Sequence, residues 1–131
     1  MAENIGFVDL KKVFDNYKET KIATERFEKK QAELRKELEK KQKQIEKAQD
    51  AKKDPDVIRK LVEEIQEDLQ PKREELMKLN NQLMAKIRTD IIRATNKVSK
   101  KYGVDLVLDK QAILTGGFDL TDFVIEDLNN K

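Results

Sequence analysis

The side chains able to do chemistry in this sequence are almost all carboxylates and amines. There are 26 Asp and Glu and 28 Lys and Arg, but no histidine and no cysteine. Histidine and cysteine supply the commonest nucleophile–base pairs and nearly all transition-metal ligands, so those chemistries are excluded. Carboxylate pairs such as Glu63–Glu64 and Glu74–Glu75 lie in a helical pattern, where adjacent residues do not face each other. We therefore expect no enzyme activity, no metal site and no cofactor.

Two methionines are candidates for binding. Met77 and Met84 are seven residues apart, each one position from a leucine of an apolar heptad pattern, Leu76 and Leu83. The flexible thioether of methionine suits adaptable contacts with many different partners. The alternative is that both side chains pack beside the seam of a helix pair.

A basic cluster surrounds the most abrupt break in the helical pattern, at "AQDAKKDPDVIRK", residues 48–60. Its members are Lys40, Lys41, Lys43, Lys47, Lys52, Lys53, Arg59 and Lys60. Each lysine near an anionic membrane contributes about 1 kcal/mol, so the cluster is a candidate contact for anionic lipid or acidic proteins. The alternative is a solvated helix surface on which Glu39, Glu46 and Asp50 pair with these lysines. Nucleic-acid binding is not expected, because no aromatic residue lies among the lysines.

Long helices must position these side chains. Apolar residues follow a heptad pattern from about residue 20 to 52, with Gln31 and Lys41 interrupting it, and again from 55 to 101, with Lys72 as the polar lapse. Asp54 suits a helix N-cap and Pro55 suits the first helical position. So short a connection makes the two helices antiparallel neighbours. The sequence predicts a helical hairpin over residues 20–101 with its tip near 51–55.

One residue conflicts with an uninterrupted second helix. Pro71 has no N–H to bond the carbonyl of Glu67, and its ring clashes with that carbonyl. We expect a bend or break near residues 67–71.

The two ends of the chain carry strand patterns. Short apolar runs predict strands at 5–10, 104–108 and 112–115, and a helix closes the chain after about residue 120. Three short strands are too few for an independent sheet with a buried face, so oligomerisation is expected to complete them. The predicted class is α+β, mainly α. The predicted division is a body of residues 1–19 and 102–131, with the hairpin of 20–101 inserted between its halves.

Charge and hydropathy restrict the setting. The net charge is only +2, but residues 18–102 carry 24 Lys and Arg against 17 Asp and Glu, and the two ends are acidic. No apolar run approaches the length of a membrane span. The opening "MAENIGF" lacks the basic start and apolar stretch of a signal peptide. If the protein is exported, we expect that Met1 stands here in place of its signal peptide.

Three segments carry a resemblance to a known family. They are the opening from Phe7 to Phe14, "DLVLDKQA" from Asp105 to Ala112, and "DLTD" from Asp119 to Asp122. With the strand–hairpin–strand order, the chain resembles the Skp/OmpH family of periplasmic chaperones over essentially its whole length. The resemblance implies a homotrimer in which strands from three subunits build a small β-barrel body, and three hairpins hang from it as tentacles around a cavity.

The resemblance also implies a function and partners. It predicts an ATP-independent holdase in the periplasm that binds unfolded outer-membrane proteins between the tentacles and prevents their aggregation. Anionic lipid or lipopolysaccharide is a further candidate partner. Two alternatives stay open: a structural coiled-coil adaptor and a prefoldin-like cytosolic chaperone.

Overall fold

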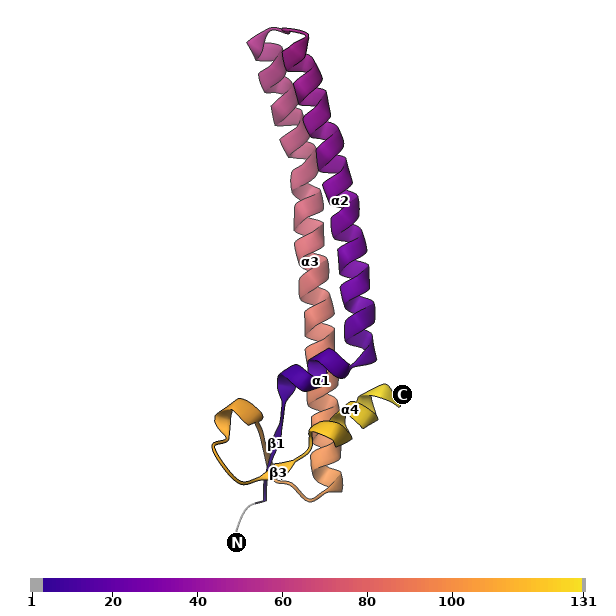
Figure 1. Cartoon of the computed structure of the whole chain (residues 1–131), viewed down its shortest axis with the longest axis vertical. Helices are drawn as coiled ribbons and strands as arrows, with labels where there is room; N and C mark the ends of the chain where they lie inside the picture. Colours follow the sequence, from indigo (N-terminus) through magenta and orange to yellow (C-terminus); the bar gives the residue numbers. More distant parts are fainter. Residues whose placement is uncertain (1–3, 131) are drawn as a thin grey trace. The chain divides into compact units, whose positions relative to one another are not determined.

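The computed structural model of the chain describes residues 4–130, and Met1, on which the leader expectation rests, lies outside them. The elements are, in order, β1 (Ile5–Val8), α1 (Leu10–Asn16), α2 (Lys18–Asp50), α3 (Pro55–Lys101), β2 (Leu106–Asp109), the 3₁₀ turn η1 (Lys110–Ala112), β3 (Phe118–Asp119) and α4 (Thr121–Asn129) (Figure 1). The class is α+β and mainly α, as expected.

The chain divides into two compact units. The sheet unit comprises Met1–Thr24 and Leu83–Lys131, and the hairpin unit comprises Glu25–Gln82. Since α2 and α3 pass through both units, each unit holds part of each long helix. The predicted body of residues 1–19 and 102–131 was defined by its expected role in oligomerisation, whereas the two units are defined by compactness. The predicted division therefore stays a prediction.

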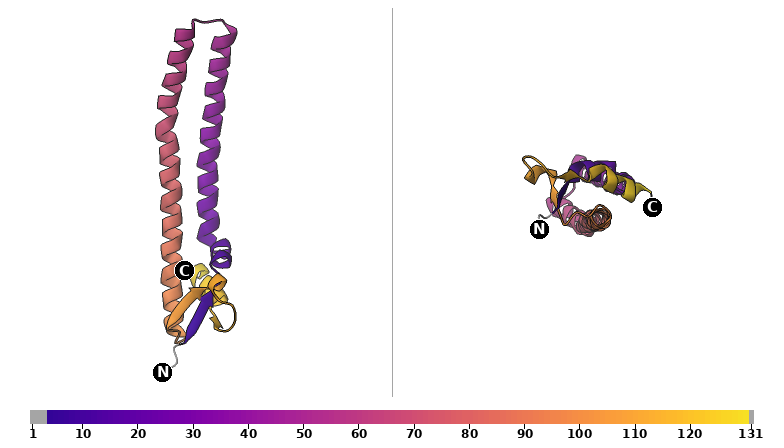
Figure 2. Two further views of the ribbon diagram at one scale, coloured as in Figure 1. Left: turned by 90° about the vertical axis from the view of Figure 1, so that its left-hand side faces the viewer. Right: turned by 90° about the horizontal axis from the view of Figure 1, so that it is seen from below.

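The long helices begin and end where local signals place them. α2 ends at Asp50 and α3 begins at Pro55, so the connection is residues 51–54. The Asp54 carboxylate accepts a hydrogen bond of 2.9 Å from the backbone N–H of Asp56, which satisfies a free donor of the first turn of α3. Within the hairpin unit the two helices lie side by side and antiparallel (Figures 1 and 2).

The end of α2 contains an unusual backbone conformation. The backbone N–H of Lys53 bonds the carbonyl of Ala48, and that of Lys52 bonds the carbonyl of Gln49. This is a Schellman ending, whose left-handed position is usually glycine. Here Lys52 occupies it with a φ of 51°. The hairpin tip therefore holds a strained residue.

Of the bend or break expected at Pro71, the break is absent. α3 runs without interruption from Pro55 to Lys101, with Pro71 inside it. Proline removes only the one hydrogen bond to the Glu67 carbonyl. Both residues are exposed, so water can satisfy that carbonyl, and the turns on either side keep their own bonds.

The sheet differs from its sequence-based prediction. In the described chain its three strands are parallel, in the order β2-β1-β3, and they do not close into a barrel. The strand expected at 112–115 is not formed. Instead η1 turns the chain out of the sheet, Gly116 and Gly117 adopt positive φ, and β3 follows at Phe118. Only the strand at 112–115 was wrongly predicted: the chain leaves the sheet at η1, and the glycine pair then redirects it toward β3, while the strand predicted at 104–108 is found as β2.

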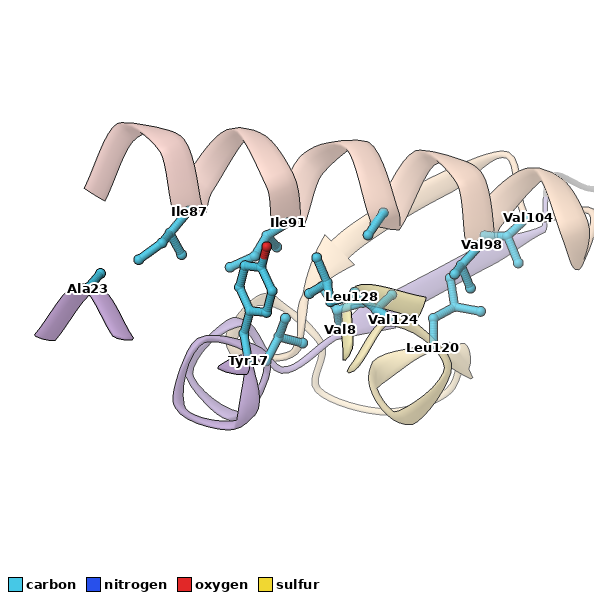
Figure 3. Packing of buried hydrophobic residues seen from close by; sticks show 12 residues of the cluster. Val8, Tyr17, Ala23, Ile87, Ile91, Val98, Val104, Leu120, Val124 and Leu128 are labelled. Atoms are coloured by element: carbon cyan, nitrogen blue, oxygen red, sulfur yellow. The ribbon is translucent and has the colours of Figure 1, made fainter. Parts of the chain in front are cut away.

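The main cluster of buried apolar residues lies in the sheet unit. Twelve buried residues form one cluster between α3, α4, α1 and the sheet, and Figure 3 shows the side chains of Ile87, Ile91 and Val98 pointing from α3 toward Tyr17, Leu128 and Leu120. Gly6 of β1 lies against this cluster, since a Cβ there would come within 2.9 Å of the Val104 side chain.

Candidate functional surfaces

The two methionines occupy different environments. Met77, in the hairpin unit, is 67% exposed. Met84, in the sheet unit, is half-buried and packs against the core cluster. Met77 is therefore available to a partner, whereas replacement of Met84 would disturb the core as well as any contact. The seven-residue spacing could not distinguish them, because both lie one position from the heptad leucines.

The basic cluster gathers around the hairpin tip. Lys41 pairs with Asp68 at 3.7 Å, and Arg59 pairs with Asp56 at 3.6 Å and Glu63 at 4.0 Å. Lys40, Lys43, Lys47, Lys52, Lys53 and Lys60 are exposed.

The acidic side chains considered from the sequence do not pair with these lysines. Among the described residues, Glu39, Glu46 and Asp50 form no ion pair with the lysines of the basic cluster. The tip thus presents exposed lysines to solvent with acidic residues interspersed among them, and its exposed pairs contribute little to stability.

A hollow lies between α2 and α3 in the hairpin unit. It has a volume of about 360 Å³, and Leu34, Leu76 and Leu79 are its apolar lining. All three leucines are only half-buried. An ion pair between Lys72 and Glu37 joins the two helices at its rim, and this hydrogen bond raises the pKa of Lys72.

Sequence reasoning missed this hollow. The heptad pattern predicts buried seam positions at Leu34, Leu76 and Leu79. The signal that could have found it is the pair of polar lapses at Gln31 and Lys72, which flank these leucines along the two helices. A charged side chain at a seam position keeps its end in water and so prevents close approach of the helices.

One face of the sheet is uncovered in the single chain. Val8 and Val107 contribute to the core side, so the alternating residues Ile5, Leu106 and Leu108 lie on the other side. Ile5 is paired with Leu106 in the parallel register, and these two are 41% and 44% exposed. Parallel sheets are normally covered on both faces. This apolar face is therefore a candidate interaction surface.

The sheet unit also carries exposed side chains beyond the strands. Leu114, in the loop between η1 and β3, is fully exposed. Tyr102 lies 4.4 Å from Phe123 and 5.9 Å from Phe118 between ring centroids, which makes a partly exposed aromatic group. Exposed apolar side chains gathered in this way mark interaction sites.

Two searches for other site types were negative. Within residues 4–130 no helix is long and apolar enough to cross a membrane. In the same part of the chain no three metal-ligating side chains gather at one point.

The fold and the exposed surfaces together indicate a general class of protein. A long antiparallel hairpin with exposed methionine and lysine, next in sequence to a small parallel sheet with an uncovered apolar face, presents candidate surfaces for contact with other chains. A family model described as outer membrane protein (OmpH-like) matches residues 4–128. The chain belongs to this family, which is the Skp/OmpH family expected from the three motifs and is of periplasmic chaperone type. A search of curated proteins found no significant match.

Proposed function

We propose that the protein is an ATP-independent holdase of the periplasm that keeps unfolded outer-membrane proteins soluble. The observation that carries this proposal is the family match over residues 4–128. Family members of this kind act on other proteins and are not enzymes. Exposed apolar side chains on a basic hairpin support the proposal, because a holdase must bind many sequences weakly.

The proposal is tested by suppression of aggregation. A urea-unfolded outer-membrane β-barrel protein is diluted into buffer with and without the chain, in the absence of ATP, and light scattering is followed. A holdase keeps scattering low at stoichiometric amounts. Unchanged scattering would favour the structural adaptor instead. Bovine serum albumin at the same mass concentration controls for crowding.

Client contact is assigned first to Met77. Replacing Met77 by Glu removes an exposed apolar side chain and adds one negative charge. The matched control is Asn81→Glu, one helical turn away and also exposed, which adds the same charge without removing apolar surface. We expect Met77→Glu to weaken client binding about threefold more than Asn81→Glu. Equal effects would assign the loss to charge and remove Met77 from the client surface.

Salt separates the apolar and the basic contributions. Exposed charges are screened beyond roughly 10 Å at 0.1 M ionic strength, whereas apolar contacts are not weakened. Client affinity should therefore fall with added salt to a salt-resistant remainder, and Met77→Glu should reduce that remainder. Affinity that is independent of salt would exclude the tip lysines as client contacts.

The second part of the proposal is assembly as a homotrimer. The uncovered apolar face that includes Ile5, Leu106 and Leu108 supports it, since a partner copy would bury this face. Two outer strands, β2 and β3, each leave one edge unpaired in the described chain. Sheets from three copies that join at these edges would make the small barrel, with the three hairpin units as its tentacles.

Light scattering in solution tests the assembly. The wild type should have the mass of three 15.3 kDa chains at micromolar concentration. Leu106→Asp places a charge on the uncovered face and should dissociate the trimer. Gln111→Asp, exposed and close by in η1, is the control and should leave the mass unchanged. A wild type that is monomeric with full secondary structure would refute the trimer.

The tip lysines are assigned to anionic surfaces. Lys52→Glu with Lys53→Glu reverses charge at the exposed connection. Sedimentation with vesicles of phosphatidylglycerol, and with lipopolysaccharide, should fall at least tenfold in this variant, while vesicles of phosphatidylcholine alone should bind neither protein. Equal sedimentation of variant and wild type would refute the lipid contact.

A further inference from the structure

The hollow between α2 and α3 has the leucines of the heptad seam as its floor. Closer to the tip, Ala48, Ile65 and Leu69 of the seam are buried while Leu38 and Ile45 are half-buried, and the hollow beside Ile65 is lined mainly by charged and polar side chains. At the hollow, Leu76 and Leu79 lie one turn apart on α3 and remain half-buried opposite Leu34. The chain thus leaves an apolar floor between two helices that could have packed together.

The rim of the hollow is electrically balanced. It carries three basic and three acidic side chains, Arg26, Lys30, Lys72, Glu33, Glu37 and Glu75. Lys30 pairs with Glu33 at 3.7 Å, and Lys72 pairs with Glu37. The hairpin helices as a whole are basic, so a neutral rim distinguishes this place from the lysine-rich tip. A charged ligand gains nothing from such a rim, whereas polar groups of either sign find a partner there.

The size of the hollow sets the size of its ligand. An apolar cavity of about 150 Å³ holds one benzene. A hollow of about 360 Å³ therefore has room for two side chains of aromatic size. In an extended segment, side chains i and i+2 point the same way and are separated by roughly 7 Å, which suits a floor made of leucines one helical turn apart.

We propose that the hollow is a binding site for a short extended segment of a client chain in which apolar and uncharged polar residues alternate. Two apolar side chains enter between α2 and α3, and the intervening polar residues face the mixed rim. Transmembrane strands of outer-membrane barrels have this alternation. The inference rests on the proposed holdase function for its biological client, but the site lies within one hairpin, independent of any cavity between subunits.

Cysteine labelling tests the site directly, because the chain has no cysteine of its own. Leu79→Cys places a thiol on the floor of the hollow, and Val57→Cys places a control thiol on the exposed surface of α3. The probe is a capped eight-residue peptide alternating phenylalanine with serine. It should slow alkylation of the floor thiol by iodoacetamide at least fivefold and leave the control thiol unaffected. A peptide with the same residues in two blocks should protect the floor thiol less.

Filling the hollow gives an independent test. Leu79→Trp should occupy the space and, since the chain has no other tryptophan, report its environment by a blue-shifted emission. We expect this variant to bind the alternating peptide at least fivefold more weakly while its thermal midpoint is unchanged or raised. Val57→Trp, on the exposed surface, should bind as the wild type does. Weaker peptide binding without a lower thermal midpoint indicates a filled site. Weaker binding with a lower thermal midpoint would indicate unfolding instead.

The outcomes distinguish this inference from the holdase proposal. Equal peptide binding by wild type and Leu79→Trp, or alkylation of the floor thiol that the peptide does not slow, would overturn the site. A wild type that fails to suppress client aggregation would overturn the holdase, yet the peptide measurements would still decide the site. Protection of the floor thiol by an unfolded outer-membrane protein as well as by the peptide would support both.

Discussion

The sheet unit and the hairpin unit use apolar residues in opposite ways. In the sheet unit, twelve buried residues from helices and strands form one cluster, with Val13, Leu120 and Val124 fully enclosed. In residues 25–82, all of which are described, the buried apolar residues are Ala48, Ile65 and Leu69. One unit is fixed by packing and the other leaves its apolar side chains available. A protein that binds many different chains benefits from one rigid unit and one unit with accessible apolar side chains.

The largest expected effect comes from the core of the sheet unit. Leu120→Ala removes a fully buried side chain and should lower the free energy of unfolding by about 3 kcal/mol. Leu76→Ala, at a half-buried position of the hairpin unit, should lower it by about 1 kcal/mol. Urea denaturation followed by circular dichroism, at one chain concentration for all variants, measures both. Equal losses would remove the contrast between the two units.

Pro71→Ala should stabilise the hairpin unit. Alanine restores the N–H that can bond the Glu67 carbonyl and removes the ring clash, with an expected gain of about 2 kcal/mol. Hydrogen exchange of the amides around residues 60–80 should slow accordingly. Gln66→Ala, at another exposed position of the same helix, is the control and should change exchange little. Faster exchange in the alanine variant would mean that the proline is better accommodated than its missing bond implies.

Tyr17 gives the sheet unit a dependence on alkaline pH. Its hydroxyl donates to Asp90 at 2.8 Å, and burial followed by this hydrogen bond raises its pKa above the ordinary value of 10.0. A raised folded-state pKa means that the stabilisation is complete below pH 10 and is lost as pH rises above it. Tyr17→Phe should cost about 1 kcal/mol at pH 7.

The measurement for Tyr17 is a difference between two proteins. The unfolding free energies of wild type and Tyr17→Phe, measured from pH 7 to 11.5, should converge at the alkaline end. Every other side chain is common to the two proteins, so its contribution cancels in the difference. A constant difference across this range would show that the pKa of Tyr17 is not raised in the folded protein.

The smallest expected effect is at the tip. Lys52 holds a left-handed conformation, with a φ of 51°, that glycine adopts without penalty. Lys52→Gly should raise the thermal midpoint slightly, corresponding to roughly 0.5–1 kcal/mol. Lys53→Gly removes the same charge next to this position and should give no gain. A loss of stability in Lys52→Gly would indicate that the lysine makes a contact that offsets its strain.

The parts of the fold that local chemistry determines could be predicted from the sequence. Asp54, Pro55 and the lysines before Gly103 mark the ends of α3 because capping and proline act on their own immediate neighbours. The parallel sheet could not be predicted in this way, since β1 pairs with residues about 100 positions later. Pro71 does not break α3, because an exposed helix can leave one carbonyl to water, and a bend at that point stays a prediction.

The sequence predicted which types of side chain the candidate surfaces contain, but not the surroundings of each side chain. Exposed lysines at the tip follow from composition and position. The different environments of Met77 and Met84 arise because Met84 packs against the core cluster and Met77 does not, and no short-range pattern contains that information. The hollow at Leu76 and Leu79 lies where the heptad pattern predicts buried leucines that the structure leaves half-buried.

The pairing of β1 with β2 and β3 has a consequence for the order of folding. Ile5 finds its partner Leu106, and Gly6 its partner Phe118, only after nearly the whole chain has been made. The hairpin has local contacts and a short turn, so it can form before β1 pairs with β2 and β3. Once formed, it brings residues 25 and 82 close and shortens the loop that sheet closure must span. The slow step in refolding is therefore expected to be capture of the N-terminal strand, after the hairpin has formed.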